Sequence, residues 1–360
     1  MKKRMDYILF ISVLIICIFG IIMIYSSSSI WAEFKYQDAF KYVKQQGLFF
    51  IVGIFVMLIC SKINLDFLKK KANLILGVCF LLLVLVLIPG IGTIRNGSRS
   101  WFGIGGLGIQ PSEFAKLGLI IFTAKYLARN QKNMVDVKKG ALPIFLVIGV
   151  FFLFIMLEPD FGTAMVMALT LIALIFVSGL KISFFVKLGI LGLAGIVLLI
   201  IAAPYRMARI VSFLNPWSDP LGSGYQIIQS LYAIGPGGLL GQGFLNSRQK
   251  HFYLPEPQTD FIFSIISEEF GFLGVLIVCG FFFLLFYRML RIALRSNDLF
   301  QKYLTFGLAF GIFIQASLNL AVVVGLIPVT GVTLPFFSYG GSSLLISMIG
   351  VGLVLNVSRK

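Results

Sequence analysis

Ten apolar runs of 16 to 27 residues dominate this sequence, and short polar breaks separate most of them. A helix that spans a membrane needs about 20 predominantly apolar residues, so each run is a candidate spanning helix. Of the 360 residues, 59% are apolar and 12% are charged, against roughly 25% charged residues in soluble domains. A soluble globular fold and a disordered chain are both excluded. The runs lie at residues 7–29, 46–61, 72–89, 113–129, 140–157, 161–179, 184–203, 261–287, 303–326 and 339–357.

This pattern predicts an all-α polytopic membrane protein that forms one domain over residues 1–360, with about ten spanning helices. The second run is short, and the fifth and sixth runs almost touch, so nine or eleven spans stay open. The longest break, at about 204–260, lies between the seventh and eighth runs.

The basic residues predict the orientation. Lys and Arg concentrate in the cytoplasmic segments of membrane proteins, and 20 of the 30 basic residues fall in breaks that share a side with the N-terminus. We therefore expect both chain ends in the cytoplasm and the 204–260 segment outside. Because the net charge of +16 is spread over short breaks between spans, it does not indicate a nucleic-acid partner.

The acidic residues show the opposite bias. Ten of the 14 Asp and Glu residues lie on or near the outer side, where they balance ten basic residues. Several stand at span edges or within spans, where an ionisable group is costly and usually functional. The sequence therefore predicts that any chemistry faces outward.

Asp260 stands where the long outer segment becomes the eighth span. In a helix, Asp260, Ser264 and Ser267 share one face, and a polar stripe on an apolar helix lines a cavity or another helix. A carboxylate at this position could equally cap the start of the helix. The pattern alone leaves both interpretations open.

Charged residues also mark two other outer span edges. Glu113 and Lys116 lie three residues apart at the entrance of the fourth span, so they can pair. The pair either serves a substrate or locks the helix as an internal salt bridge. Pro159 separates the fifth run from the sixth, so we expect Glu158 and Asp160 at the outer surface. A turn with a helix cap would also explain these two carboxylates.

Three further cations are candidate phosphate contacts on the outer side. Arg99 lies in a basic, aromatic loop that suits a phosphate group, or that anchors the chain at the membrane interface. Arg248 and Lys250 precede Asp260 by about ten residues. No Cys or His spacing typical of a metal site is present, so no metal ligands are assigned.

Two segments combine glycine with irregular backbone. Glycines at 235–243 either cradle a pyrophosphate through backbone N–H groups or allow close packing of backbone. The Pro- and Gly-rich break at 328–342 is typical of a re-entrant loop, because such backbone is tolerated at membrane depth only against protein or a wet cavity.

Five stretches are far more specific than any single short motif. They are QPSEFAK (110–116), EPDFGT (158–163), FLNPWSDPLGSGYQ (213–226), QKHFYLPEPQTDFIFSIISEE (249–269) and PFFSYGGSS (335–343). Through these stretches the chain resembles the SEDS family (shape, elongation, division and sporulation) along essentially its whole length. Their residues are most similar to those of the FtsW/SpoVE branch.

The resemblance implies a ten-span peptidoglycan glycosyltransferase of the bacterial cytoplasmic membrane that acts on lipid II, the undecaprenyl-pyrophosphate-linked precursor. It implies a class B penicillin-binding protein as crosslinking partner, and other division or sporulation membrane proteins. By residue match, Asp260 is the family's essential acidic residue. Glu113 and Lys116 match its buried charged pair, and Arg99 lies in its basic outer loop. Asn215 departs from the pattern, since many relatives carry Asp there, so position 215 is not expected to supply the base.

The chemistry that the resemblance implies fits these positions. Glycan polymerisation needs a base for the acceptor hydroxyl and a cationic site for the departing pyrophosphate. Asp260 is the expected base, and a divalent cation, Mg²⁺ or Mn²⁺, is left open. A lipid II flippase and a non-catalytic scaffold are the alternatives; a flippase would need a headgroup site on both faces. The expected substrate contacts are Arg99, Glu113, Lys116, Asp160, Arg248, Lys250 and Ser264.

Overall fold

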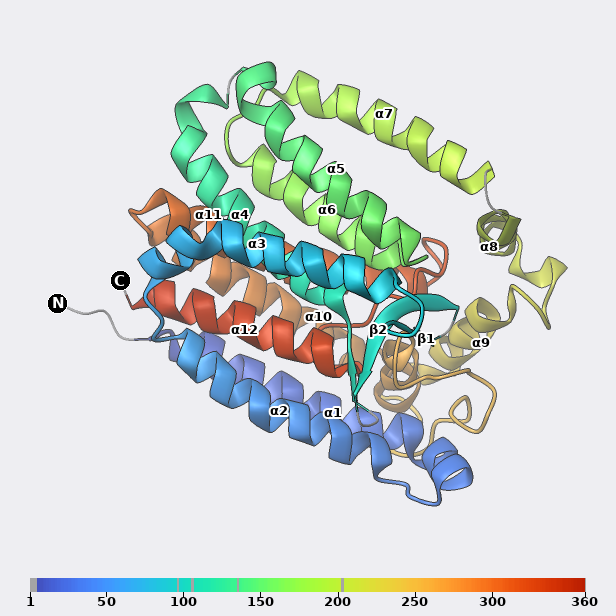
Figure 1. Ribbon diagram of the computed structural model, residues 1–360. Coiled ribbons are helices and arrows are strands. Elements are labelled where there is room, and N and C mark those ends of the chain that lie inside the picture. The colour runs from blue at the N-terminus through green and yellow to red at the C-terminus, as the bar shows by residue number, and fades with distance from the viewer. Residues whose placement is uncertain (1–4, 96, 105–106, 135, 202–203, 360) are drawn as a thin grey trace.

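The computed structural model describes residues 5–95, 97–104, 107–134, 136–201 and 204–359. In these ranges the chain forms twelve α-helices and one three-stranded sheet. Figure 1 shows a bundle of long helices with both chain ends at one end and the sheet, α8 and α9 at the other. The helices are α1 (Tyr7–Tyr36), α2 (Lys41–Cys60), α3 (Leu65–Leu87), α4 (Pro111–Asn130), α5 (Leu142–Leu157), α6 (Phe161–Phe176), α7 (Ile182–Ile201), α8 (Pro204–Leu214), α9 (Tyr225–Ile234), α10 (Ile262–Arg295), α11 (Leu299–Val323) and α12 (Gly341–Ser358).

Seven helical segments of the described chain are long and apolar enough to cross a membrane: α1, α2, α3, residues 137–157, α10, α11 and α12. Helix α6 is shorter, and α4 carries four charged residues along its 20 positions. Helices α1–α7 and α10–α12 all overlap the ten predicted runs. The prediction of a helical, multi-pass membrane protein is confirmed, while the count of ten spans and the side of each loop stay predictions.

Polar caps fix where several helices begin. The Asp6 carboxylate accepts a hydrogen bond from the Leu9 N–H at 3.0 Å, and Asp298 accepts one from the Gln301 N–H at 2.9 Å. The Asn64 side chain caps α3 in the same way. Each cap satisfies an N–H group that has no partner inside its own helix.

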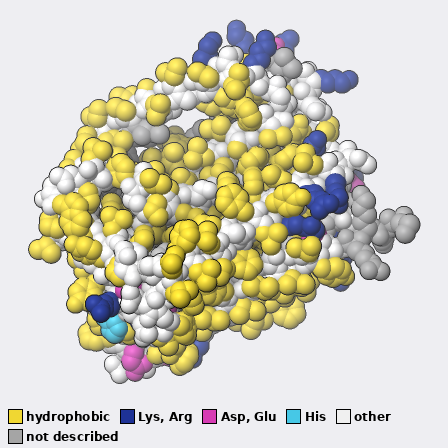
Figure 2. Space-filling view, turned by 180° about the vertical axis from the view of Figure 1, so that it is seen from behind, with side chains coloured by type: hydrophobic (Ala, Val, Ile, Leu, Met, Phe, Trp, Pro, Cys, Tyr) yellow, Lys and Arg dark blue, Asp and Glu magenta, His cyan; other side chains and the backbone are white. Residues whose placement is uncertain are grey.

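The two chain ends are tied together. The Arg288 guanidinium of α10 lies 2.5 Å from the Asp6 carboxylate, and the Asp6 N–H donates to Ser358 Oγ at 3.1 Å. Figure 2 shows most of the Lys and Arg side chains of one face gathered toward this end, beside a broad hydrophobic surface. This asymmetry supports the orientation expected from the basic residues.

A small sheet packs at the opposite end. Strands β1 (Thr93–Arg95), β2 (Ser98–Ile104) and β3 (Leu107–Ile109) pair antiparallel in that order. From the sequence we expected only a loop here, because two of the three strands are three residues long and leave too little alternation to detect. The sheet gives Arg99 a fixed backbone on β2.

Helix α10 is kinked at Gly271, whose φ of 59° and ψ of −156° lie outside the helical region. At the kink the glycine-rich segment 237–243 lies against the helix. Four backbone hydrogen bonds of 2.8–3.1 Å join them, two in each direction. A Cβ on Gly241 would lie 2.2 Å from the Glu269 carbonyl oxygen. The glycines here therefore serve close backbone packing, the second of the two interpretations left open by the sequence.

We predict that Gly271→Ala destabilises the protein by at least about 3 kcal/mol, because Cβ strain at this φ adds to overpacking. A Cβ there would lie 2.4 Å from the Gly241 nitrogen. Gly280→Ala, in the same helix with no atom within 4 Å of its Cβ, is the matched control and should be neutral or stabilising. Thermal unfolding in detergent measures both; equal midpoints would show that the kink does not require glycine.

Candidate functional site

The break between α11 and α12, residues 324–340, folds back into the bundle, and we call it the re-entrant loop. Leu334, Phe336 and Phe337 on it are buried. The Gln46 carboxamide of α2 donates to the Ser338 carbonyl oxygen at 3.1 Å. The loop's irregular backbone is thus satisfied by protein groups, as such backbone requires inside a membrane protein.

Two carboxamides of α11 hold the loop from the other side. Asn319 Nδ2 donates to the carbonyl oxygens of Val332 and Asp260, both at 2.7 Å. One helical turn earlier, Gln315 Nε2 donates to the Thr333 carbonyl oxygen at 3.1 Å. Neither residue was predicted from the sequence, although two polar residues four apart within an apolar span are a detectable feature.

Asp260 is half-buried at the turn that precedes α10. The N-cap position of α10 is Phe261, and no side chain caps it. Capping therefore does not account for Asp260. Its carboxylate faces the re-entrant loop, since a Cβ built on Gly331 would lie 3.7 Å from Asp260 Oδ2.

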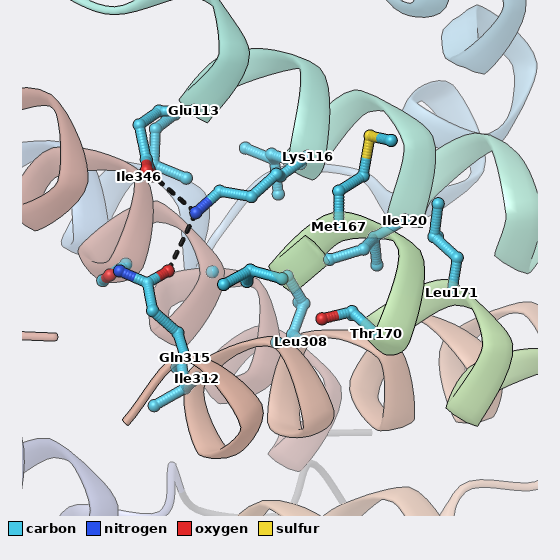
Figure 3. A pocket seen from close by; sticks show the side chains of 15 residues that line it. Glu113, Lys116, Ile120, Met167, Thr170, Leu171, Leu308, Ile312, Gln315 and Ile346 are labelled. Atoms are coloured by element: carbon cyan, nitrogen blue, oxygen red, sulfur yellow. Dashed lines mark hydrogen bonds and ion pairs between the residues drawn. The ribbon is translucent and has the colours of Figure 1, made fainter. Parts of the chain in front are cut away.

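Glu113 and Lys116 form a buried ion pair on α4, with 2.8 Å between the ammonium and the carboxylate. Figure 3 shows Lys116 reaching between Glu113 and Gln315, whose Oε1 accepts a second hydrogen bond at 2.8 Å. A cavity of about 50 Å³ beside the pair is otherwise lined largely by apolar side chains of α4, α6, α11 and α12. This volume exceeds the 10–15 Å³ that one water needs, so the pair borders a small internal space.

Asp160 caps α6 and connects it to the start of α4. Asp160 Oδ1 accepts from the Thr163 N–H at 3.0 Å, and Oδ2 accepts from Gln110 Nε2 at 2.8 Å. Burial raises the pKa of Asp160, and the hydrogen bonding from Thr163 opposes the rise. The carboxylate is thus fully used in holding two helix starts together.

Glu158, two residues earlier, is fully buried, and neither carboxyl oxygen has a hydrogen-bond partner in the described part of the chain. Its carbonyl oxygen accepts a hydrogen bond from the Ser98 hydroxyl of β2. Burial, and then the negative charge of Asp160, raises the pKa of Glu158 to about 9. Glu158 is therefore neutral at pH 7. Arg99 lies next to Ser98 on the strand and is partly exposed.

A second buried ion pair anchors the 204–260 segment to the bundle. Lys250 Nζ lies 3.0 Å from Glu269 Oε1 on α10, and the Ser26 hydroxyl of α1 donates to the same oxygen at 2.5 Å. Lys250 is 4% exposed, so its ammonium faces protein groups. We call Lys250, Glu269 and Ser26 the outer clamp.

The neighbouring Glu268 extends this anchor through backbone groups. Its carboxylate accepts from the Ser247 hydroxyl at 2.5 Å and from the Arg248 N–H at 2.8 Å. The Arg248 side chain itself is exposed. Ser264 is buried on α10, with its hydroxyl 2.8 Å from that of Ser230 on α9. Of the expected contacts near Asp260, Arg248 is accessible, whereas Lys250 and Ser264 face protein.

The described residues contain no group of three or more His, Cys, Asp or Glu side chains that could hold a metal ion. The donor set around Asp260 thus does not make up a protein metal site.

Comparison with known proteins assigns the fold to a family. Residues 6–360 match the FtsW/RodA/SpoVE family, described as cell cycle proteins. The chain belongs to this family. It is 51% identical to stage V sporulation protein E of Bacillus subtilis, over 99% of this chain and 98% of the relative. It is 42% identical to a probable peptidoglycan glycosyltransferase FtsW of Geobacter sp., over 99% and 97% of the two chains.

Solved family structures share the whole fold. A chain of a peptidoglycan synthase complex, described for its coordination of polymerization and crosslinking, superposes with a TM-score of 0.79 at 34% identity, covering 99% of this chain and 98% of that one. The rod shape determining protein RodA of Thermus thermophilus gives 0.72 at 30% identity, with 99% and 97% covered. The family resemblance inferred from the motifs is confirmed.

We predict that Lys116→Met costs about 3–5 kcal/mol, because it leaves the Glu113 charge buried without its partner. The double variant Glu113→Gln/Lys116→Met should recover most of this loss. The exposed pair Asp38–Lys44, at 2.9 Å, is the matched control, and Lys44→Met should cost less than about 1 kcal/mol. Unfolding free energies in detergent test the cycle; a double variant as unstable as Lys116→Met would contradict it.

The raised pKa of Glu158 predicts a pH dependence. The unfolded chain loses this proton near pH 4.5 and the folded chain near pH 9, so folding stability falls as the pH rises through that window. Glu158→Gln mimics the neutral carboxyl and should remove this component. We expect the variant's unfolding midpoint to gain on the wild type between pH 5 and about 9. If the unfolding midpoints of the variant and the wild type change with pH in the same way, Glu158 is paired or solvated.

Proposed function

We propose that this chain is a peptidoglycan glycosyltransferase that polymerises lipid II at the outer face of the cytoplasmic membrane. The observation that carries the proposal is the placement of Asp260. Its backbone is fixed by Asn319, and its carboxylate faces the re-entrant loop without capping α10. Family membership supports the reaction class, since a relative that covers the full chain is named for this activity.

In the proposed reaction, a sugar hydroxyl of one substrate attacks the anomeric carbon of the other. The Asp260 carboxylate accepts the hydroxyl proton as the new glycosidic C–O bond forms. The bond between the anomeric carbon and the pyrophosphate oxygen breaks, and the lipid-linked pyrophosphate leaves with the electron pair. General-base catalysis of this kind contributes typically 10²–10⁴-fold in rate.

The leaving pyrophosphate needs positive charge nearby. The proposed phosphate contacts with accessible side chains are Arg248, which is exposed and precedes the start of α10 by 14 residues, and Arg99 on β2. For Lys250 we propose a positioning role within the outer clamp in place of the phosphate contact expected from sequence. Ser264 receives the same reassignment because it bonds Ser230.

The site is supported by three further residues at the starts of α4 and α6: Glu113, Lys116 and Asp160. Through Gln315, the ion pair holds Thr333 of the re-entrant loop. Asp160 fixes the starts of α4 and α6. We propose that these three residues hold the substrate-facing surface in shape and border the path of the lipid-linked substrate.

The similar peptidoglycan synthase complex, described for both polymerization and crosslinking, supports a partner for this chain. We propose that it works with a class B penicillin-binding protein transpeptidase, in cell division or sporulation. The 51% identity to a stage V sporulation protein supports a sporulation role among these.

We predict that Asp260→Asn slows lipid II polymerisation by about 10²–10⁴-fold while the protein keeps its fold and partner binding. Asn is nearly the same size but cannot accept the proton. Gel analysis of glycan strands made by purified protein from lipid II measures the rate.

The matched control is Asp219→Asn, an exposed carboxylate in the same outer segment that bonds the Ser223 N–H at 2.7 Å. It should polymerise at the wild-type rate. If Asp260→Asn retains more than about a tenth of the normal rate, on this scale of base contributions, Asp260 is not the base. A wild-type protein that forms no polymer would favour a transporter or a scaffold.

A further inference from the structure

A second cavity lies near the end of the bundle that carries the chain termini. It is open, has a volume of about 360 Å³, and is lined by six residues of α3 and α4. This volume falls within the 300–1,000 Å³ of typical ligand sites and is about seven times that of the cavity beside Lys116. The lining residues are Asn73, Phe122, Lys125, Tyr126, Arg129 and Asn130.

The lining residues of α4 occupy one helical face. Positions 122, 125, 126, 129 and 130 follow the i, i+3, i+4, i+7, i+8 spacing. Two of them are fixed by bonds to backbone. The Tyr126 hydroxyl donates to the Gly140 carbonyl oxygen at 2.8 Å, and Asn130 Nδ2 donates to the Tyr126 carbonyl oxygen at 3.0 Å. The cavity therefore has a defined wall.

The polar groups of the cavity are donors. Lys125 Nζ donates to Asn73 Oδ1 at 2.8 Å, which orients the Asn73 amide and leaves its Nδ2 free to face the cavity. Arg129 is exposed at the rim, and no carboxylate lines the cavity or pairs with either cation among the described residues. Two cations and an amide donor without an acid partner match a phosphate group.

The surroundings distinguish a lipid from a free anion. Phe122 lines the cavity, and farther along α3 the side chains of Leu74 and Val78 are 60% and 48% exposed. Leu74 follows Asn73 directly and Val78 lies one turn farther along, so both belong to the flank of α3 beside the face that carries Asn73. This exposed flank offers an apolar surface for acyl chains beside the cavity.

We propose that this cavity binds the phosphodiester headgroup of an anionic glycerophospholipid, with its acyl chains along α3. Basic pockets between helices at the cytoplasmic side of a membrane are suited to such headgroups. The site is at the opposite end of the bundle from Asp260. The proposal rests on the orientation expected from the basic residues and is independent of the polymerase reaction.

The test is native mass spectrometry of the full-length protein in detergent with added phosphatidylglycerol or phosphatidylcholine of the same acyl chains. The wild type should retain phosphatidylglycerol preferentially. Lys125→Gln/Arg129→Gln should weaken phosphatidylglycerol binding about thirtyfold, at roughly fivefold for each charge removed, and leave phosphatidylcholine binding unchanged.

The matched control is Arg291→Gln/Arg295→Gln, which removes two exposed cations from the same end of the bundle on α10. It should bind phosphatidylglycerol as the wild type does. If the control loses phosphatidylglycerol binding to the same extent, the binding comes from general surface charge and the proposed site is overturned. Displacement of the lipid by millimolar inorganic phosphate would show a free-anion site, and no preference for phosphatidylglycerol would also overturn the proposal. Arg129→Lys, which keeps the charge, should retain the preference, and unchanged phosphatidylcholine binding by the double variant separates a lost site from a folding defect.

Discussion

The carboxamide of Asn319 joins the two segments on which the outer site is built. One nitrogen donates to the backbone before α10 and to the re-entrant loop at the same 2.7 Å. Gln315, one turn away, joins the next loop residue to the Glu113–Lys116 pair. Because unsatisfied carbonyl groups are expensive where water is absent, these two side chains hold Asp260, the loop and the ion pair in one arrangement.

Most of the acidic residues discussed at this end of the bundle form ion pairs or hydrogen bonds within the protein. Glu113 is paired with Lys116, and Glu269 is paired with Lys250. Glu268 binds backbone and hydroxyl groups of the outer segment. Buried ion pairs of this kind add little net stability, since desolvation offsets their attraction. Their value here is in fixing which segments meet, while Asp260 keeps its carboxylate turned toward the re-entrant loop.

The helical pattern of the fold could be predicted because apolar length alone specifies a candidate span. The partners of the buried charges could not. The Glu113–Lys116 pair was accessible to sequence reasoning because its members lie three residues apart. Lys250 meets Glu269 and Ser26 across 19 and 224 positions of the chain, so its position in the sequence could not reveal these partners. The sheet and the kink at Gly271 depend on tertiary backbone contacts that leave no periodic trace.

The reciprocal hydrogen bonds between segment 237–243 and α10 also constrain how this family can diverge. An insertion or deletion within 238–243 or within 268–273 would shift one side of that ladder against the other. The stretch around Asp219 is held by bonds that span only a few residues. Natural variation in loop length should therefore accumulate ahead of α9, while the two paired segments keep a constant number of residues.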